Sequence, residues 1–167
     1  MKLTTNLKLI FLLICGLVFN ACSKDDDNPS PSNCSELTSI ATINGEAYTM
    51  LGGQLLTSNG FDGIVHLFQL LAIDSGCEES KILNLNIEVP NEVNGTYPVL
   101  DFLDVGINEA SGAYGTQNLS TQSQNLHEIV SGSVTIINNG NSNYSVDFSG
   151  TLTNNEQVSF KATHTFE

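Results

Sequence analysis

The chain has 167 residues, enough for one domain with a sizeable hydrophobic core. It carries 18 acidic residues against five lysines and no arginine, and its formal net charge is −13. An acidic surface repels phosphate backbones, and a chain without arginine lacks the planar group that grips phosphate. The composition therefore excludes nucleic-acid binding.

The first 21 residues have the composition of a signal peptide. Lys2 and Lys8 form a basic start, residues 9–18 are apolar, and Ala21 is a small residue just before Cys22. An apolar core of about ten residues falls well short of the ~20 that span a bilayer. The arrangement resembles the leader of bacterial lipoproteins, which implies cleavage before Cys22 and a lipid on that cysteine. The alternative is an ordinary secreted protein in which Cys22 forms a disulfide.

The residues after Cys22 are Ser23, Lys24, Asp25, Asp26 and Asp27. They resemble the export signal of Bacteroidota lipoproteins, a lysine and acidic residues just beyond the lipidated cysteine. The resemblance implies a lipoprotein of the outer membrane exposed at the cell surface, with the periplasmic face of that membrane as the alternative. A solvated acidic tether is the other interpretation of the segment.

The linker composition sets the expected domain boundaries. Residues 28–33 contain only Asn, Pro and Ser, which indicates an extended linker. We therefore expect a signal peptide over 1–21, a lipidated tether over 22–36 and one β domain over 37–167. Cleavage would leave three lysines and all 18 acidic residues, a formal charge of −15.

Once Cys22 is acylated and Cys15 is removed, Cys34 and Cys77 are the cysteines that remain. An envelope protein meets oxidising conditions, which favours a disulfide between them. Closing a loop of about 44 residues would stabilise the fold by roughly 4 kcal/mol, an upper figure because strain in the folded state reduces it. Two buried free thiols are the alternative.

Alternation of apolar and polar residues predicts strands along the rest of the chain, because successive side chains of a strand point to opposite faces. Asn-Gly pairs at 44–45 and 94–95 and polar segments at 139–142 and 154–156 suit tight turns between strands. The last three strands form an antiparallel meander. The predicted strands cover residues 40–42, 47–50, 83–89, 96–100, 132–138, 144–152 and 158–166.

Two segments are less regular. Residues 64–73 are apolar on both faces, and their length of about ten, the Gly63 boundary and the β neighbours favour a central strand over a buried helix. Residues 103–111 show no clear period and suit a short helical turn or a loop over the end of a barrel.

The fold class follows from these elements. We expect an all-β domain of about eight to ten strands, either an antiparallel β-sandwich or a small β-barrel built of hairpins and a meander. The chain has no tryptophan, which argues against an immunoglobulin domain.

Three short motifs accompany this pattern: Asn44-Gly45, Gly95-Thr96-Tyr97-Pro98, and the pair Ser149-Gly150-Thr151-Leu152 and Phe160-Lys161-Ala162-Thr163. Together they resemble Bacteroidota surface lipoproteins with a small C-terminal β domain. The resemblance supports the fold class and implies no activity.

Candidate chemical groups are scattered. His66, His127 and His164 lack the local spacing of a metal site, and residues of the core or its edge are the expected assignment. The carboxylates that could supply a glycosidase pair are Glu88, Asp101, Asp104, Glu109, Glu128 and Asp147. No pair among them stands out.

A calcium site is the best metal candidate. Its oxygen ligands would come from Asp101, Asp104, Asn108 and Glu109, which fall within nine residues of a predicted loop. The set lacks the spacing of an EF-hand, and an ordinary acidic loop is the alternative. No other cofactor is expected.

These observations favour a non-enzymatic binding or accessory domain that is anchored in the membrane by the lipid on Cys22. Its expected partner is a glycan, a peptide or another envelope protein, and Tyr48, Tyr97 and Tyr114 are the rings on which a sugar could stack. The alternatives are a lipocalin-like barrel with a small apolar ligand inside, and a carboxylate-dependent hydrolase.

Overall fold

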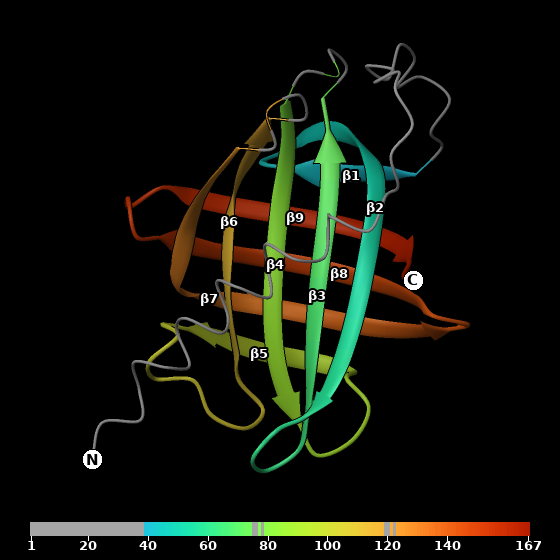
Figure 1. The fold of residues 1–167 in the computed structure, drawn as a ribbon, viewed down its shortest axis with the longest axis vertical. Coiled ribbons are helices and arrows are strands. Elements are labelled where there is room, and N and C mark those ends of the chain that lie inside the picture. The colour runs from blue at the N-terminus through green and yellow to red at the C-terminus, as the bar shows by residue number, and fades with distance from the viewer. Residues whose placement is uncertain (1–38, 75–76, 78, 119–120, 122) are drawn as a thin grey trace. The chain divides into compact units, whose positions relative to one another are not determined.

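The computed structural model describes residues 39–74, 77, 79–118, 121 and 123–167. Within this part of the chain, nine strands form a closed barrel without helices (Figure 1). The all-β class is confirmed, and the barrel is the architecture found. No helix among these residues has the length and hydropathy that a membrane span requires. The strands are β1 (Ile40–Ile43), β2 (Glu46–Asn59), β3 (Ile64–Ile73), β4 (Glu79–Val89), β5 (Gly95–Leu100), β6 (Ala110–Asn118), β7 (Gln124–Gly140), β8 (Asn143–Leu152) and β9 (Gln157–Thr165).

The order of strands departs from the order of the chain at one place. β1 to β4 pair consecutively, as do β7 to β9, and β1 pairs with β9 to close the barrel. β6 lies between β4 and β5, and meets β5 through a single parallel bridge, Val99 to Ala110. Beyond β5, β6 pairs directly with the first part of β7, whereas the later part of β7 pairs with β5. The short strand β5 therefore lies between β6 and β7 where these two long strands separate.

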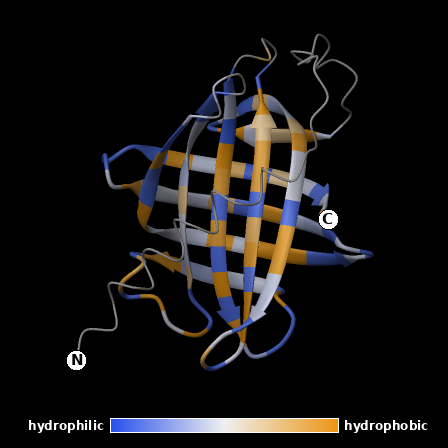
Figure 2. Cartoon of the chain, in the orientation of Figure 1, coloured by the Kyte–Doolittle hydropathy of each residue, from blue (hydrophilic) through white to orange (hydrophobic). Residues whose placement is uncertain are grey.

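Two walls of different composition face each other. In Figure 1, β2, β3, β4 and β6 run vertically, and β5, β7, β8 and β9 cross behind them. Figure 2 shows β3 apolar along most of its length, whereas polar and apolar positions alternate on β8 and β9. On β9, Val158, Phe160 and Ala162 are buried and the residues between them are exposed. The meander is confirmed, and residues 64–73 form a strand, not a helix.

The tight turns at 44–45 and 139–142 use the residues that the sequence suggests. The turn predicted at Asn94-Gly95 is wrong, because β4 and β5 do not pair with each other: β4 pairs with β3 and β6, and β5 with β6 and β7. Asn44 and Gly45 have φ angles of 50° and 86° between β1 and β2, as a two-residue hairpin of type I′ requires. Asn141 and Ser142, at 52° and 57°, make the equivalent turn between β7 and β8. Residues 101–109 form a loop with turns between β5 and β6.

The barrel interior is packed with side chains. Phe68, Tyr144 and Phe166 contact one another edge to face, with ring centroids 5.3 to 5.7 Å apart. The largest fully buried side chains are Phe68, Phe148, Phe160, Met50, Leu70, Ile73, Ile82, Leu83, Leu85, Ile87, Ile129 and Ile136.

Candidate functional site

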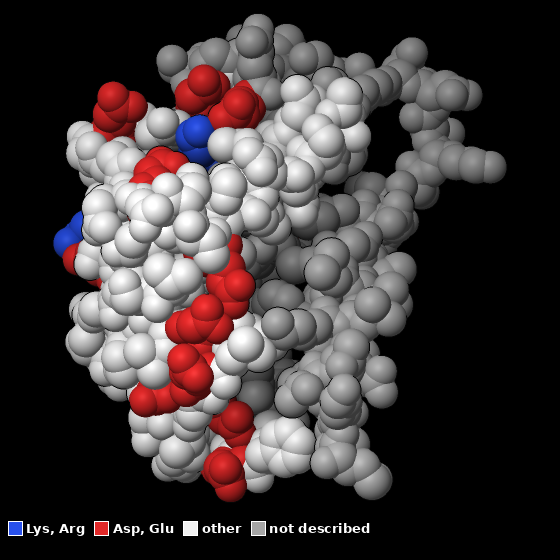
Figure 3. Space-filling model, turned by 90° about the vertical axis from the view of Figure 1, so that its left-hand side faces the viewer, with Lys and Arg blue, Asp and Glu red and all other residues white. Residues whose placement is uncertain are grey.

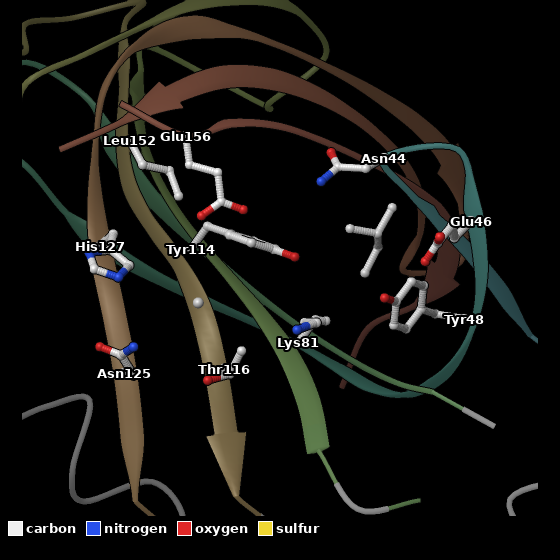
Figure 4. A pocket seen from close by; sticks show the side chains of 12 residues that line it. Asn44, Glu46, Tyr48, Lys81, Tyr114, Thr116, Asn125, His127, Leu152 and Glu156 are labelled. Atoms are coloured by element: carbon white, nitrogen blue, oxygen red, sulfur yellow. The ribbon is translucent and has the colours of Figure 1, made fainter. Parts of the chain in front are cut away.

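A cavity of about 380 Å³ opens at one end of the barrel, and we call this end the mouth (Figure 4). Its walls come from segments far apart in the sequence: the β1–β2 hairpin, the start of β4, the middle of β6, the start of β7 and the β8–β9 turn. The lining residues are Ile43, Asn44, Glu46, Tyr48, Lys81, Tyr114, Gly115, Thr116, Asn125, His127, Leu152 and Glu156. Most of them carry hydrogen-bonding groups.

The β1–β2 hairpin supplies one side of the mouth. The side-chain Oδ1 of Asn44 accepts a hydrogen bond from the backbone N–H of Ser159 at 2.8 Å, and the N–H of Asn44 donates to the Ser159 carbonyl at 3.0 Å. These bonds tie the hairpin tip to β9 and hold it over the rim. On β2, Glu46 and Tyr48 alternate in phase with buried Met50, so both face the cavity.

Tyr114 lies across the mouth. Its side chain is 6 % exposed, and its ring extends across the cavity toward Tyr48 and Lys81 (Figure 4). Burial raises the pKa of the Tyr114 phenol above its ordinary value, and the charges of Tyr48, Glu156 and Glu79 act in the same direction. The hydroxyl therefore stays protonated and can donate a hydrogen bond to a ligand.

The mouth carries more negative than positive charge. Lys81 is the one cation among the lining residues, and its Nζ is paired with Glu79 Oε1 at 2.8 Å. Glu46 and Glu156 add two carboxylates to the lining. In Figure 4 the carboxylate of Glu156 extends into the space above the Tyr114 ring. The arrangement suits a neutral or cationic ligand that offers hydrogen-bond donors to the carboxylates.

β6 and β7 approach closely beside the cavity. A β-carbon at Gly115 would collide with the backbone oxygen of Asn125 on β7. Across the same pair of strands, Tyr114 lies opposite His127 and Thr116 opposite Asn125. The close approach thus places four polar side chains on one wall of the mouth.

The carboxylates selected from the sequence do not line this cavity. In the β5–β6 loop they hold the backbone: Asp101 Oδ1 accepts from the N–H of Leu103 at 3.0 Å, and Glu109 Oε2 from that of Gly106 at 2.7 Å. Glu128 Oε1 accepts from Phe102 N–H at 3.2 Å and Glu88 Oε1 from Asp62 N–H at 2.8 Å, while Asp147 pairs with Lys161 at 2.6 Å.

No group of three or more His, Cys, Asp or Glu side chains that could hold a metal ion occurs within the described ranges. The calcium candidate of Asp101, Asp104, Asn108 and Glu109 therefore gains no support from the geometry. The carboxylates of Asp101 and Glu109 accept hydrogen bonds from the loop backbone instead, and the backbone carbonyl of Asp101 accepts one from the N–H of Asp104 at 2.9 Å.

The histidines lie apart. His66 is buried on β3, with Nε2 3.3 Å from the Asn91 carbonyl oxygen. His164 is half-buried and contacts Phe166 edge to face, with ring centroids 5.9 Å apart. His127 is the histidine that lines the mouth.

Of the three tyrosines considered as stacking platforms, two are not exposed. Tyr97 is 7 % exposed, and its hydroxyl accepts a hydrogen bond from Asn94 N–H at 3.0 Å, so it belongs to the packed interior. Tyr114 is equally buried but borders the cavity, and Tyr48 is half-buried beside it.

The sequence did not predict several residues that line the mouth, because only the strand register brings them together. These residues are Glu46, Lys81, Asn125 and Glu156.

The N-terminal predictions fall outside the described residues. These predictions are lipidation at Cys22, the export signal at Ser23, Lys24, Asp25, Asp26 and Asp27, and the contribution of Cys34 to a disulfide. Cys77 is disulfide-bonded. Its pairing with Cys34 stays a prediction.

Comparison of the chain with protein-family models, with curated proteins and with solved structures found no match. The geometry of the mouth is therefore the basis for a functional assignment.

Proposed function

We propose that this protein is a lipid-anchored binding domain of the bacterial outer membrane that holds a small hydroxyl-rich ligand, such as the end of a glycan, in the mouth of its barrel. Cys22 would carry the lipid, and the acidic tether would present the domain at the cell surface. The convergence of Tyr48, Tyr114, Glu46 and Glu156 on one cavity carries the proposal.

The chemistry of the lining fits such a ligand. Sugar hydroxyls donate well to carboxylates, and the protonated Tyr114 hydroxyl can donate to a ring or hydroxyl oxygen. The tyrosine rings offer apolar faces to the C–H surface of a sugar, as in pockets that combine an apolar wall with a few placed polar groups. The excess of acidic groups disfavours phosphorylated or sulfated ligands.

The packed interior argues against the lipocalin-like alternative. Phe68, Phe148 and Phe160 occupy the space where an apolar ligand would lie. A carboxylate-dependent hydrolase is the second candidate, because Glu46 and Glu156 line the same cavity. That activity would require one of them to act as an acid and the other as a base or nucleophile.

Titration of the full chain with neutral oligosaccharides, followed by calorimetry, tests the binding proposal. We expect binding that is weakened about tenfold by Tyr114→Phe, since one buried hydrogen bond is lost. Tyr144→Phe makes the same chemical change outside the mouth, and we expect affinity within about twofold of the wild type. Equal weakening by both variants, or no binding of any neutral sugar, would contradict the assignment.

Product analysis in the same experiment separates the two candidates. A bound oligosaccharide that stays intact supports the binding domain. Cleavage that disappears in both Glu46→Gln and Glu156→Gln would establish the hydrolase instead.

Extracellular protease on intact cells tests the location. We expect loss of the wild-type protein and protection of a variant in which Lys24, Asp25, Asp26 and Asp27 are alanine. Protection of the wild type would place the domain on the periplasmic face.

A further inference from the structure

The β2–β3, β4–β5 and β5–β6 loops lie together at the end of the barrel opposite the mouth (Figure 1). We call this end the loop end. Several apolar side chains in and beside these loops are exposed. Phe61, in the β2–β3 hairpin, is 93 % exposed, and Leu103 in the β5–β6 loop is 64 % exposed. Ile107 and Ile64 are 38 % and 37 % exposed. A phenylalanine so completely in water contributes little to folding, and several such residues at one place indicate an interaction surface.

Glu88 of β4 holds two of these loops side by side. Its carboxylate Oε1 accepts from the N–H of Asp62 at 2.8 Å, and its backbone carbonyl accepts from the N–H of Asn108 at 2.8 Å. Phe61 directly precedes Asp62, and Ile107 directly precedes Asn108. Glu88 therefore holds the backbone next to both Phe61 and Ile107.

The hairpin tip is also held from behind. A β-carbon at Gly63 would collide with the Val89 carbonyl, which shows how closely the tip lies on the end of β4. In the β5–β6 loop, Asp101 accepts a hydrogen bond from the N–H of Leu103 itself, and Glu109 accepts one from the N–H of Gly106. The apolar side chains thus project from backbone that is already held, so a partner would lose little free energy in ordering that backbone.

The surroundings of the loop end are acidic. Asp62, Glu92, Asp101, Asp104 and Glu109 lie in or beside these loops. Lys81 and Lys161, the lysines of the described part of the chain, lie elsewhere and are both ion-paired. Figure 3 shows acidic side chains continuing to the lower end of the molecule, whereas basic ones appear higher up. Negatively charged lipid would be repelled by this end.

We propose that the loop end docks a basic, apolar segment of another protein. Phe61 and Leu103 would insert among the apolar side chains of that segment, and its lysines or arginines would face the acidic residues around them. An exposed aromatic residue supports affinity, and complementary charge near it supports the orientation of a partner. This surface is separate from the mouth, and the proposal does not depend on the mouth ligand.

A synthetic helical peptide of leucine and lysine, labelled for fluorescence anisotropy, is the probe for the full chain. We expect binding that Phe61→Ser/Leu103→Ser weakens at least tenfold. Ile40→Ser removes an apolar side chain of matched exposure, 66 %, on β1, and should leave the affinity unchanged. Because Phe61 and Leu103 are exposed, the double variant should fold, and an unchanged melting temperature will verify this.

Charge is tested with two variants that each lose two negative charges. Asp62→Asn/Asp104→Asn acts at the loop end, and Glu46→Gln/Glu156→Gln acts at the mouth. We expect the first to weaken binding of the peptide several-fold more than the second. Equal weakening would mean a nonspecific attraction to an acidic protein and would overturn the proposal.

Two further probes define the partner class. A peptide with glutamate in place of lysine should not bind. Vesicles of zwitterionic phosphatidylcholine should not bind either, and binding to them that depends on Phe61 and Leu103 would make the loop end a lipid-docking surface and overturn the proposal. Failure of the leucine–lysine peptide to bind would overturn it as well.

Discussion

His164 is a half-buried histidine beside the strands that close the barrel. It lies on β9, with Nδ1 3.4 Å from the Ser39 hydroxyl. Burial lowers the pKa of the imidazole from its ordinary value of 6.5, and the Glu167 carboxylate opposes this effect. The folded state therefore favours the neutral ring.

We expect His164 to make the fold less stable in mild acid. Below about pH 6.5 the unfolded chain binds a proton at this histidine that the folded chain takes up only at lower pH, so unfolding is favoured as the pH falls. We expect His164→Gln to lose less stability than the wild type when the pH falls from about 7.5 to about 5.5. Thermal melts of both proteins at the two pH values measure it. An equal or larger change in the variant would show that the ring is not held neutral.

Gly115 permits the approach of two elements, β6 and β7, beside the mouth. We expect Gly115→Ala to cost about 1–3 kcal/mol of stability, because its β-carbon would meet the Asn125 carbonyl and the strands would have to separate. Gly52→Ala is the matched control, since no atom lies within 4 Å of its β-carbon. Urea denaturation of both variants gives the two free energies. Equal stability would show that β6 and β7 have room to move apart.

The strands differ in how far the sequence reveals them. β8 and β9 each have one buried and one exposed face, so their alternation predicted them closely. β6 was not predicted. Its residues Ala110, Ser111 and Gly112 are small and are buried on both faces of the strand, so apolar and polar residues do not alternate along it. The long β2 was predicted only over its first residues for a similar reason, since Gly52 and Gly53 interrupt the apolar pattern near a β-bulge.

The mouth could not be predicted from local patterns. Its lining comes from six strands and two turns, and Tyr114 on β6 faces Tyr48 on β2 only because the barrel closes. The predicted acidic loop does exist between β5 and β6, but its carboxylates hold the loop and do not form a site. Spacing along the chain identifies the residues of a turn, whereas a cavity between distant strands depends on register and closure.

At the scale of the whole molecule, β3 joins the two proposed surfaces. It begins with Ile64 at the loop end and finishes with Ile73 at the mouth end, where disulfide-bonded Cys77 follows. If Cys34 is the partner and Cys22 carries the proposed lipid, the tether would join the domain at the mouth end, and the 12 residues from Cys22 to Cys34 would reach at most roughly 40 Å from the membrane. The loop end would then point away from the membrane, where a protein partner can approach.

We expect this disulfide to contribute to stability as well as to orientation. Loss of a cross-link that closes about 44 residues should cost up to roughly 4 kcal/mol, because the unfolded chain gains conformational freedom. Guanidinium denaturation of the mature chain, compared with Cys34→Ser/Cys77→Ser, measures this cost. Cys34→Ser alone is the informative control, since it leaves Cys77 in place but without its partner. Peptide mapping should find the two cysteines in one cross-linked fragment of the wild type. A double variant as stable as the wild type, or free Cys34 in the map, would remove the reason to place the membrane on the mouth side of the barrel.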